Sequence, residues 1–383
     1  MKKVIYLTTS LFPEGQAYSV RVIGFAALFK SLGYSVHVIA DSTRQTDIVR
    51  NKIYTFDYGT YEISGKNGRL SSNLTNKYFA IAALKKQLSN SDACAVVANA
   101  SSDRFNDVLL LCHKNGVKLI LEVCEWYDVI SSRLGLIDYR NYRMNRMMEK
   151  GYSKADSIIA ISRYLEQHFS KRNNIVIRIP TIFDTQQLLY TIDSNNQKIV
   201  LVHAGSSVIH KEKFKHIMMA IQKIGKDTPI EYRIYGSSRD IVLKNIDGDD
   251  ALLHALGEQV KIMGTIPQAE VNKAYQQADF SIFMRDRKCS TSAGFPTKLA
   301  ESMAAGTPVI ANDTGDIGLY LKDGYNGFLI NDNSIEEIES TLRKVISLSS
   351  KQKKNMRENA RKTAEASFDY RSYIDIVKEL FKD

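Results

Sequence analysis

The stretch over residues 292–311, SAGFPTKLAESMAAGTPVIA, constrains the fold of this chain more than any other. A loop of small residues, with Gly294 and Pro296, leads into a helical run that stops at Gly306, and a β-branched strand follows over 307–311. Proline suits the first turn of a helix, and glycine suits the position just past its end. The stretch is therefore a loop–helix–strand unit, as found in α/β folds with a parallel sheet.

The start of this helix carries groups that suit an anionic ligand. The first helical turn presents free N–H groups, which bind anions, and phosphate above all. Thr297 and Lys298 lie in that turn, and Glu301 follows Thr297 by four residues and so faces the same side. We expect a phosphate cradle, a hydroxyl, a cation and a diol-binding carboxylate in one cleft, and these groups suit a nucleotide-diphosphate sugar.

The same residues resemble those of a known family. GFPTKLAESMAAGTPVIA is similar to the donor-binding segment of retaining glycosyltransferases of family 4, which have the GT-B fold. The resemblance implies that Gly294, Phe295 and Thr297 line the donor site and that Glu301 holds the ribose hydroxyls of the donor. The family usually has another glutamate eight positions earlier, where this chain has Ala293, so the E-x7-E motif is degenerate. The variant SAGFPTK resembles a subset of bacterial polysaccharide transferases.

A further match to this family lies in the segment GSSVIHK. The family pattern is G-R-L-x-x-x-K-G, whose arginine and lysine contact the donor diphosphate. Gly205 and Lys211 match this pattern, whereas Ser206 replaces the arginine and Glu212 replaces the last glycine. The resemblance implies that Gly205, Ser206 and Lys211 belong to the donor site, with half of the charge clamp missing. An ordinary surface lysine is the alternative for Lys211.

Other donor-side candidates lie near the 292–311 stretch and at the ends of strands. Arg285, Lys288 and Lys298 can replace the charge of the missing arginine, although a solvated loop explains Arg285 and Lys288 equally well. In a doubly wound sheet the strand ends form the ligand crevice. We therefore place Gly236 at the donor site and expect the base near Thr265 and Ile266, mostly on backbone atoms.

Two segments of the first half are the acceptor-side candidates. FPEGQAYSVR resembles the glycine-bearing loop of the family and contributes Gly15 and Arg21, with a simple turn as the alternative. LEVCEWYD places Glu122, Glu125 and Trp126 at the end of a strand. An aromatic ring beside carboxylates suits sugar binding, and a packed tryptophan explains the pattern equally well.

Strands and helices alternate along the whole chain, which argues for parallel, doubly wound sheets. An expected strand over 52–58 belongs to the first half. A near-continuous apolar strand over 198–204 starts the second half, as buried parallel strands do. We expect the basic run over 351–362 to be a solvated helix.

The length of 383 residues exceeds one typical core, so we expect two domains. The resemblance implies the α/β architecture GT-B, in which two Rossmann-like doubly wound domains face a central cleft. Residues 1–182 would form the acceptor-side domain, completed by a C-terminal helix over 368–383. Residues 183–367 would form the donor domain.

The composition limits the classes of partner that this chain is expected to bind. The net charge of +10 fits a phosphorylated donor, an anionic membrane surface or a lipid-diphosphate acceptor. No nucleic-acid-binding module is present and the basic residues are scattered, so we expect no nucleic acid. No apolar run approaches the roughly 20 residues of a spanning helix. The seven histidines and four cysteines lack metal-binding spacing, so we expect no metal and no cofactor.

We therefore expect a metal-independent glycosyltransferase that moves a sugar from a nucleotide-sugar donor to a hydroxyl of a glycan or lipid-linked acceptor. The resemblance implies retention of configuration and a role in surface polysaccharide assembly, in a protein that is cytoplasmic or peripheral at the inner membrane face. Lys211, Lys298 and Glu125 are the catalytic candidates. Two alternatives stay open: a non-catalytic GT-B subunit that binds a nucleotide or glycan, and a nucleotide-sugar epimerase of the same fold.

Overall fold

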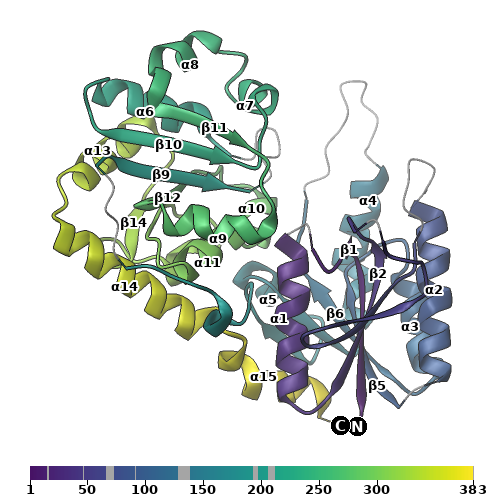
Figure 1. The fold of residues 1–383 in the computed structure, drawn as a ribbon. Helices are drawn as coiled ribbons and strands as arrows, with labels where there is room; N and C mark the ends of the chain where they lie inside the picture. Colours follow the sequence, from purple (N-terminus) through teal and green to yellow (C-terminus); the bar gives the residue numbers. More distant parts are fainter. Residues whose placement is uncertain are drawn as a thin grey trace. The chain divides into compact units, whose positions relative to one another are not determined.

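The computed structural model describes residues 1–14, 17–45, 47–65, 73–90, 92–127, 139–192, 197–205 and 212–382. The chain divides into two compact units. Unit 1 comprises Met1–Asp184, Ser292–Phe295 and Asp369–Asp383, and unit 2 comprises Thr185–Thr291 and Pro296–Phe368. Each unit contains a sheet with helices on both of its faces (Figure 1).

Unit 1 is built on a sheet with the strand order β3-β4-β2-β1-β5-β6-β7-β8 among the described residues. Its pairs are parallel except β3 with β4. Residues 4–7 of β1 are buried, because helix α1 covers one face of the sheet and α2 and α3 cover the other (Figure 1). The strands are β1 (Lys3–Leu11), β2 (Ser35–Ser42), β3 (Ile53–Phe56), β4 (Gly59–Ile63), β5 (Ala93–Asn99), β6 (Lys118–Val123), β7 (Ser157–Ala160) and β8 (Val176–Arg178). The helices are α1 (Ala17–Ser31), α2 (Asn73–Ser89), α3 (Phe105–Lys114), α4 (Tyr139–Arg146), α5 (Arg163–Phe169) and α15 (Ile374–Lys378).

Unit 2 has a fully parallel sheet with the order β11-β10-β9-β12-β13-β14 among the described residues. The strands are β9 (Ile199–Ala204), β10 (Ile230–Tyr235), β11 (Val260–Gly264), β12 (Phe280–Phe283), β13 (Val309–Asn312) and β14 (Gly327–Ile330). The helices are α6 (Phe214–Ile224), α7 (Arg239–Asn245), α8 (Asp250–Leu256), α9 (Gln268–Gln276), α11 (Thr297–Ala304), α12 (Ile317–Tyr320), α13 (Ile335–Ile346) and α14 (Ser350–Ser367). The short helix α10 (Cys289–Ala293) begins in unit 2, and its last two residues belong to unit 1. Across both units, none of the helices described is long and apolar enough to cross a membrane.

The strand order of unit 2 reverses at its first strand. β9 lies between β10 and β12, so the chain adds strands first on one side of β9 and then on the other. Doubly wound sheets bind ligands at the carboxyl ends of the strands, where the order reverses. The carboxyl ends of β9 and β12 are therefore the place to look for a site in unit 2.

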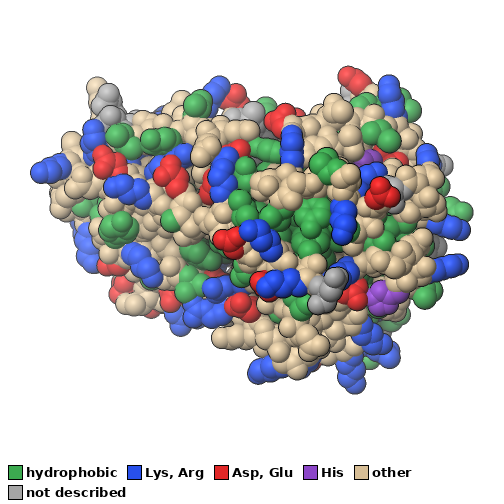
Figure 2. Space-filling view, turned by 90° about the horizontal axis from the view of Figure 1, so that it is seen from below, with side chains coloured by type: hydrophobic (Ala, Val, Ile, Leu, Met, Phe, Trp, Pro, Cys, Tyr) green, Lys and Arg blue, Asp and Glu red, His purple; other side chains and the backbone are tan. Residues whose placement is uncertain are grey.

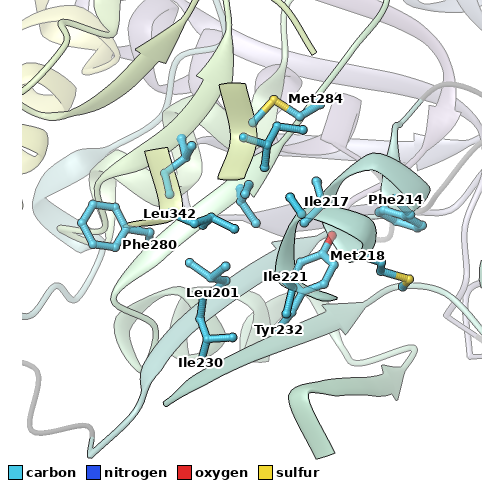
Figure 3. Packing of buried hydrophobic residues seen from close by; sticks show 14 of the residues in the cluster. Leu201, Phe214, Ile217, Met218, Ile221, Ile230, Tyr232, Phe280, Met284 and Leu342 are labelled. Carbon is cyan, nitrogen blue, oxygen red and sulfur yellow. The ribbon is translucent and has the colours of Figure 1, made fainter. Parts of the chain in front are cut away.

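The core of unit 2 holds α6 against the sheet. Figure 3 shows Ile221 of α6 beside Tyr232 of β10, and Phe214 and Ile217 of the same helix belong to the same buried cluster as Leu201 of β9. The spacing of three and four residues puts the apolar side chains of α6 on one face of the helix. Burial of Phe214 fixes the first turn of α6, and the preceding Lys213 donates its N–H to the carbonyl of Met284 at 3.0 Å, just after β12.

The C-terminal segment is not the single helix expected over 368–383. Phe368 caps α14 and belongs to unit 2. The chain then forms a 3-10 turn over Tyr370–Tyr373, the short helix α15 and a second 3-10 turn over Glu379–Phe381. Apolar residues of this segment enter the core of unit 1. The burial of these side chains, rather than one continuous series of helical hydrogen bonds, therefore determines the conformation of the segment.

Helix α14 is not the solvated helix expected over 351–362, because one face of it is buried. Arg357 is 1% exposed and Arg361 is 6% exposed. Arg357 Nε donates to the carbonyl of Thr191 at 3.0 Å, and Arg361 Nη2 donates to that of Thr185 at 2.7 Å. These arginines hold the chain segment that enters unit 2.

The strand expected over 52–58 is one half of a hairpin. β3 pairs antiparallel with β4, which begins at Gly59. A Cβ on Gly59 would lie 2.4 Å from the carbonyl oxygen of Val36 on the neighbouring strand β2. The close approach of β2 therefore requires glycine at the start of β4, where the sequence analysis expected no strand.

Candidate functional site

Gly205 follows the last residue of β9, at the point where the strand order reverses, and has no side chain to cover its backbone. Gly205 has a φ of +137°, a conformation that other residues disfavour. A Cβ at this position would lie 3.8 Å from Lys298 Cε and 3.9 Å from Lys298 Nζ. The exposed backbone of Gly205 therefore lies directly beside a lysine at the start of α11.

Lys298 lies in the first turn of α11, and the contacts of its ammonium group include two side chains of the described residues. Nζ donates to Glu212 Oε1 at 2.9 Å and to His203 Nε2 at 3.2 Å. Pro296, directly before the helix, has no side chain that can cap the N–H groups of the first turn. The lysine and the helix start thus combine two sources of positive potential.

Glu212 links Lys298 to a second cation. Arg285 follows β12, and its Nε and Nη2 donate to Glu212 Oε1 at 3.3 and 3.2 Å. The backbone N–H of Arg285 donates to Asn312 Oδ1 at 2.8 Å, which anchors this residue beside β13. Glu212 Oε2 is buried and has no hydrogen-bond partner within the described ranges. We call Lys298, Glu212, Arg285 and His203 the Lys298 cluster.

Burial and charge set the protonation of the Lys298 cluster. Burial alone would raise the pKa of Glu212, but Lys298 and Arg285 outweigh it and lower this pKa to about 2. Burial, followed by the charge of Lys298, lowers the pKa of His203 to about 3, so its ring is neutral at physiological pH. Two cations, one carboxylate and one neutral ring leave the cluster with a single net positive charge.

Acid should destabilise unit 2 through His203. Its folded pKa of about 3 lies below the ordinary value of 6.5, so between these values the unfolded chain binds a proton that the folded chain does not. The resulting stabilisation is complete above pH 6.5 and is lost as the pH falls toward 3. We expect His203→Asn to flatten the dependence of unfolding free energy on pH by up to about 1.4 kcal/mol per pH unit.

Denaturant titrations between pH 4.5 and 6.5 would isolate this effect, because the ordinary pKa of Glu212 is 4.5 and that carboxylate contributes only below it. His254→Asn is the matched control, since the His254 side chain is 82% exposed. Equal slopes in wild type and His203→Asn would show that the buried ring does not resist protonation.

The remaining candidates on α11 lie on the side of β9. Thr297 begins α11 and Glu301 follows one turn later, and both are partly exposed. Burial and then the charge of Glu301 raise the pKa of the Tyr275 hydroxyl. That hydroxyl donates to the carbonyl of Ala204, the last residue of β9, at 3.4 Å. Glu301 therefore lies close to the end of β9.

The expected base site lies at the ends of β10 and β11. The N–H of Gly236 donates to the carbonyl of Gly264 at 2.8 Å. Thr265 is exposed, and Ile266 packs against a small apolar cluster of unit 2. A Cβ on Gly264 would meet no atom within 4 Å. These strand ends are open and lie on the same edge of the sheet as the end of β9.

Five other residues are candidates predicted from the sequence. Gly15, Ser206 and Lys211 lie outside the described residues. Gly294 and Phe295 occupy the turn between α10 and α11. Their roles in binding stay predictions.

In unit 1, Arg21 and Glu122 are each other's partners. Glu122 accepts hydrogen bonds from Arg21 Nε and from the hydroxyls of Tyr6 and Tyr18. Arg21 Nη1 donates to the carbonyl of Pro180. Both side chains of the pair are at most 2% exposed. The pair is thus held inside unit 1, although Arg21 Nη2 is buried without a hydrogen-bond partner among the described residues. The role of the pair on the acceptor side stays a prediction.

Glu125 and Trp126 have different surroundings. Glu125 is exposed and accepts a hydrogen bond from the Tyr127 hydroxyl at 2.7 Å. Trp126 is buried, donates from Nε1 to Asn145 Oδ1 at 2.7 Å, and packs edge-on against His168 with ring centroids 4.5 Å apart. The tryptophan is therefore packed, and the carboxylate beside it is accessible.

The sequence analysis did not identify Glu212 and His203 as members of the Lys298 cluster. Glu212 stood out only as a replaced glycine, and His203 lies inside an apolar strand without metal-binding spacing. Glu212 and its partners are far apart in the chain, since Lys298 is 86 residues away and Arg285 is 73 residues away. No local pattern predicts such pairs.

Known proteins resemble this chain in sequence and in fold. Residues 191–363 match the family model of glycosyl transferases group 1. An uncharacterized glycosyltransferase of Methanocaldococcus jannaschii is 23% identical over 239 residues, and the match spans 60% of this chain and 60% of the length of that relative.

Solved structures resemble the whole chain. Sucrose-phosphate synthase from Thermosynechococcus elongatus has a TM-score of 0.77 at 14% identity, with 100% of this chain and 98% of that chain covered. Anabaena HepE in complex with UDP and glucose has a TM-score of 0.71 at 16% identity, with 99% of each chain covered. The chain therefore has the GT-B fold, and its residues 191–363 are similar to the glycosyl transferases group 1.

Proposed function

We infer that this protein is a glycosyltransferase that moves a sugar from a nucleotide-diphosphate donor to a hydroxyl acceptor. One observation carries the inference: the ammonium group of Lys298 lies at the start of α11, beside the bare backbone of Gly205, where the strand order reverses. A helix start and a lysine together suit a diphosphate. The family match over 191–363 includes both residues.

A nucleotide sugar is the donor that this site suits. Anabaena HepE was solved in complex with UDP-glucose, and Staphylococcus aureus TarM in complex with UDP. In this chain we assign Glu301 to the ribose hydroxyls, and Thr265 and Ile266 to the base. The open space at Gly264 supports the second assignment.

Stabilisation of the departing diphosphate is the main chemical task of the protein in this proposal. Negative charge develops on the leaving group, and cations and helix N–H groups that are already in place stabilise it without reorganising. We assign this role to Lys298 and the start of α11, together with Lys211. Glu125 remains the catalytic candidate on the acceptor side. We propose retention of configuration and chemistry without a metal.

The acceptor and the location are further parts of the proposal. We propose a glycan or lipid-linked acceptor in surface polysaccharide assembly, at the inner face of the membrane. WaaB, a lipopolysaccharide outer core galactosyltransferase, has the same fold with a TM-score of 0.64. Figure 2 shows Lys and Arg spread over one face with Asp and Glu between them, so this face suggests no single docking patch for an anionic surface.

The proposal is tested by incubating the purified protein with UDP-, GDP-, ADP- and dTDP-sugars and measuring release of the nucleoside diphosphate. Release with one donor class, increased by a hydroxyl acceptor, is the expected result. Binding without release would favour the non-catalytic subunit. Conversion of the donor sugar without release would favour the epimerase.

Glu301→Ala should weaken donor binding by about 10- to 150-fold, because hydrogen bonds to a charged group contribute about 1.5–3 kcal/mol. The fold should persist, since Glu301 is partly exposed. Glu270→Ala on α9 is the control, because the Glu270 side chain is 48% exposed and pairs along its own helix with Lys273. Calorimetric titration with the donor from the screen gives both affinities. Equal affinity in wild type and Glu301→Ala would contradict the ribose assignment.

A further inference from the structure

Glu212 carries a further inference, which rests on the proposed function. We propose that Glu212 is a built-in counter-anion: its carboxylate binds Lys298 and Arg285 in the absence of donor, and the donor diphosphate competes with it for Lys298. Glu212 thereby sets the affinity for the donor.

The hydrogen bonds of Glu212 suit a carboxylate that another anion can replace as the partner of Lys298. Oε1 accepts from Lys298 and Arg285, whereas the buried Oε2 has no partner in the described part of the chain. In unit 1, Arg104 binds Asp41 in the opposite way, with Nη1 and Nη2 donating to separate oxygens at 2.9 and 2.8 Å. Such a two-oxygen pair is the stronger arrangement. Because Glu212 binds both cations through one oxygen, its carboxylate loses less interaction energy when Lys298 binds another anion.

The charge of the Lys298 cluster also points to competition. With Glu212 ionised and His203 neutral, the two cations keep a single net positive charge. A diphosphate brings more than one negative charge into a partly buried place, where unmatched charge is costly. A ligand that binds Lys298 in place of Glu212 pairs with the full positive charge of this lysine, which the carboxylate otherwise neutralises.

The position of Lys298 makes the exchange accessible. Its ammonium lies in the first turn of α11, where N–H groups attract an anion, and next to the exposed backbone of Gly205. Arg285 is buried to a similar extent, at 8% side-chain exposure against 10% for Lys298, and keeps Glu212 paired when Lys298 changes partner. Glu212 therefore need not become an unpaired buried charge.

Isothermal titration calorimetry of the full chain tests this proposal, with UDP, GDP, ADP, dTDP and inorganic pyrophosphate as probes. The variants are Glu212→Gln and, as the matched control, Glu231→Gln. Glu231 is also buried, and it pairs with Arg233 and Lys261 on β10 and β11, so its substitution adds the same charge elsewhere in unit 2. We expect Glu212→Gln to bind the preferred nucleotide and pyrophosphate about tenfold more tightly than wild type. Glu231→Gln should bind as wild type does.

The outcomes separate this proposal from the proposed function. Weaker binding by Glu212→Gln, or binding equal to that of wild type, overturns the counter-anion while leaving the function standing if wild type binds a nucleotide. If no variant binds a nucleotide but Glu212→Gln gains affinity for pyrophosphate, the counter-anion stands and the proposed function falls. If no variant binds any of the probes, both fall.

Glu212→Asp provides a second test of the proposal in case the glutamine variant does not fold. It keeps the negative charge between the buried cations, but its shorter side chain competes less well for Lys298. Its affinity for the diphosphate probes should lie between those of wild type and Glu212→Gln. An aspartate variant that binds more weakly than wild type overturns the proposal on its own.

Discussion

Lys298→Met is expected to lower kcat/KM for sugar transfer by about 10²–10³-fold, the usual effect of removing one donor that stabilises a developing anion. Methionine keeps a flexible, apolar side chain of similar length and removes only the charge. Because the charge of the diphosphate increases as the sugar departs, most of the loss should appear in kcat. Glu212 keeps Arg285 as a partner, so the protein should remain folded. Initial rates with the donor from the screen, and calorimetric unfolding, measure the two effects.

Lys353→Met is the control for this variant. Lys353 on α14 is 17% exposed and pairs with the buried Asp279 at 3.4 Å, so it resembles Lys298 in chemistry but not in position. Its substitution should leave kcat/KM within about twofold of wild type. A wild-type rate in Lys298→Met would mean that the leaving group does not bind at the start of α11.

Arg285→Met should have the largest effect on stability, a loss of about 3–5 kcal/mol in the unfolding free energy. Glu212 is almost fully buried, and the substitution removes two of the hydrogen bonds to its carboxylate. Lys298 remains as a partner, so the loss should fall toward the lower end of this range. Denaturant unfolding, followed by circular dichroism, measures the difference.

The double variant Glu212→Gln/Arg285→Met shows whether the loss comes from the carboxylate. With the charge removed, the double variant should be more stable than Arg285→Met alone, because no buried anion is left short of a partner. Arg343→Met is the control, since this arginine is 55% exposed and pairs along its helix with Glu339, an interaction of about 0.5 kcal/mol. If the double variant loses as much unfolding free energy as the two single variants lose together, Glu212 and Arg285 act independently.

Much of the fold was predictable because its signals are local. The apolar strand expected over 198–204 is β9, and the loop–helix–strand unit over 292–311 contains α11 and β13. The errors arose where tertiary contacts override local pattern. Basic residues 351–362 suggested a solvated helix, yet two arginines of α14 are buried against backbone carbonyls. The C-terminal segment follows the core of unit 1 instead of forming one helix.

The candidate site was predictable in part. The sequence pointed to Gly205, Lys298 and Arg285, and the structure places all three around the ends of β9 and β12. It did not point to Glu212 or His203, because neither residue has a motif of its own. The sequence analysis expected Arg285 to supply positive charge for a diphosphate, whereas the structure shows this charge shared with Glu212.

The sequence by itself determined the alternation of strands and helices and the helix start that carries Lys298 beside a glycine loop. Hydrophobic period and turn chemistry act over a few residues, so they can be read along the chain. Only the tertiary structure decided which carboxylate neutralises which cation, and that His203 is neutral. Ion pairing and pKa depend on distance and burial in space, and residues 86 positions apart become partners only once the sheet of unit 2 has formed.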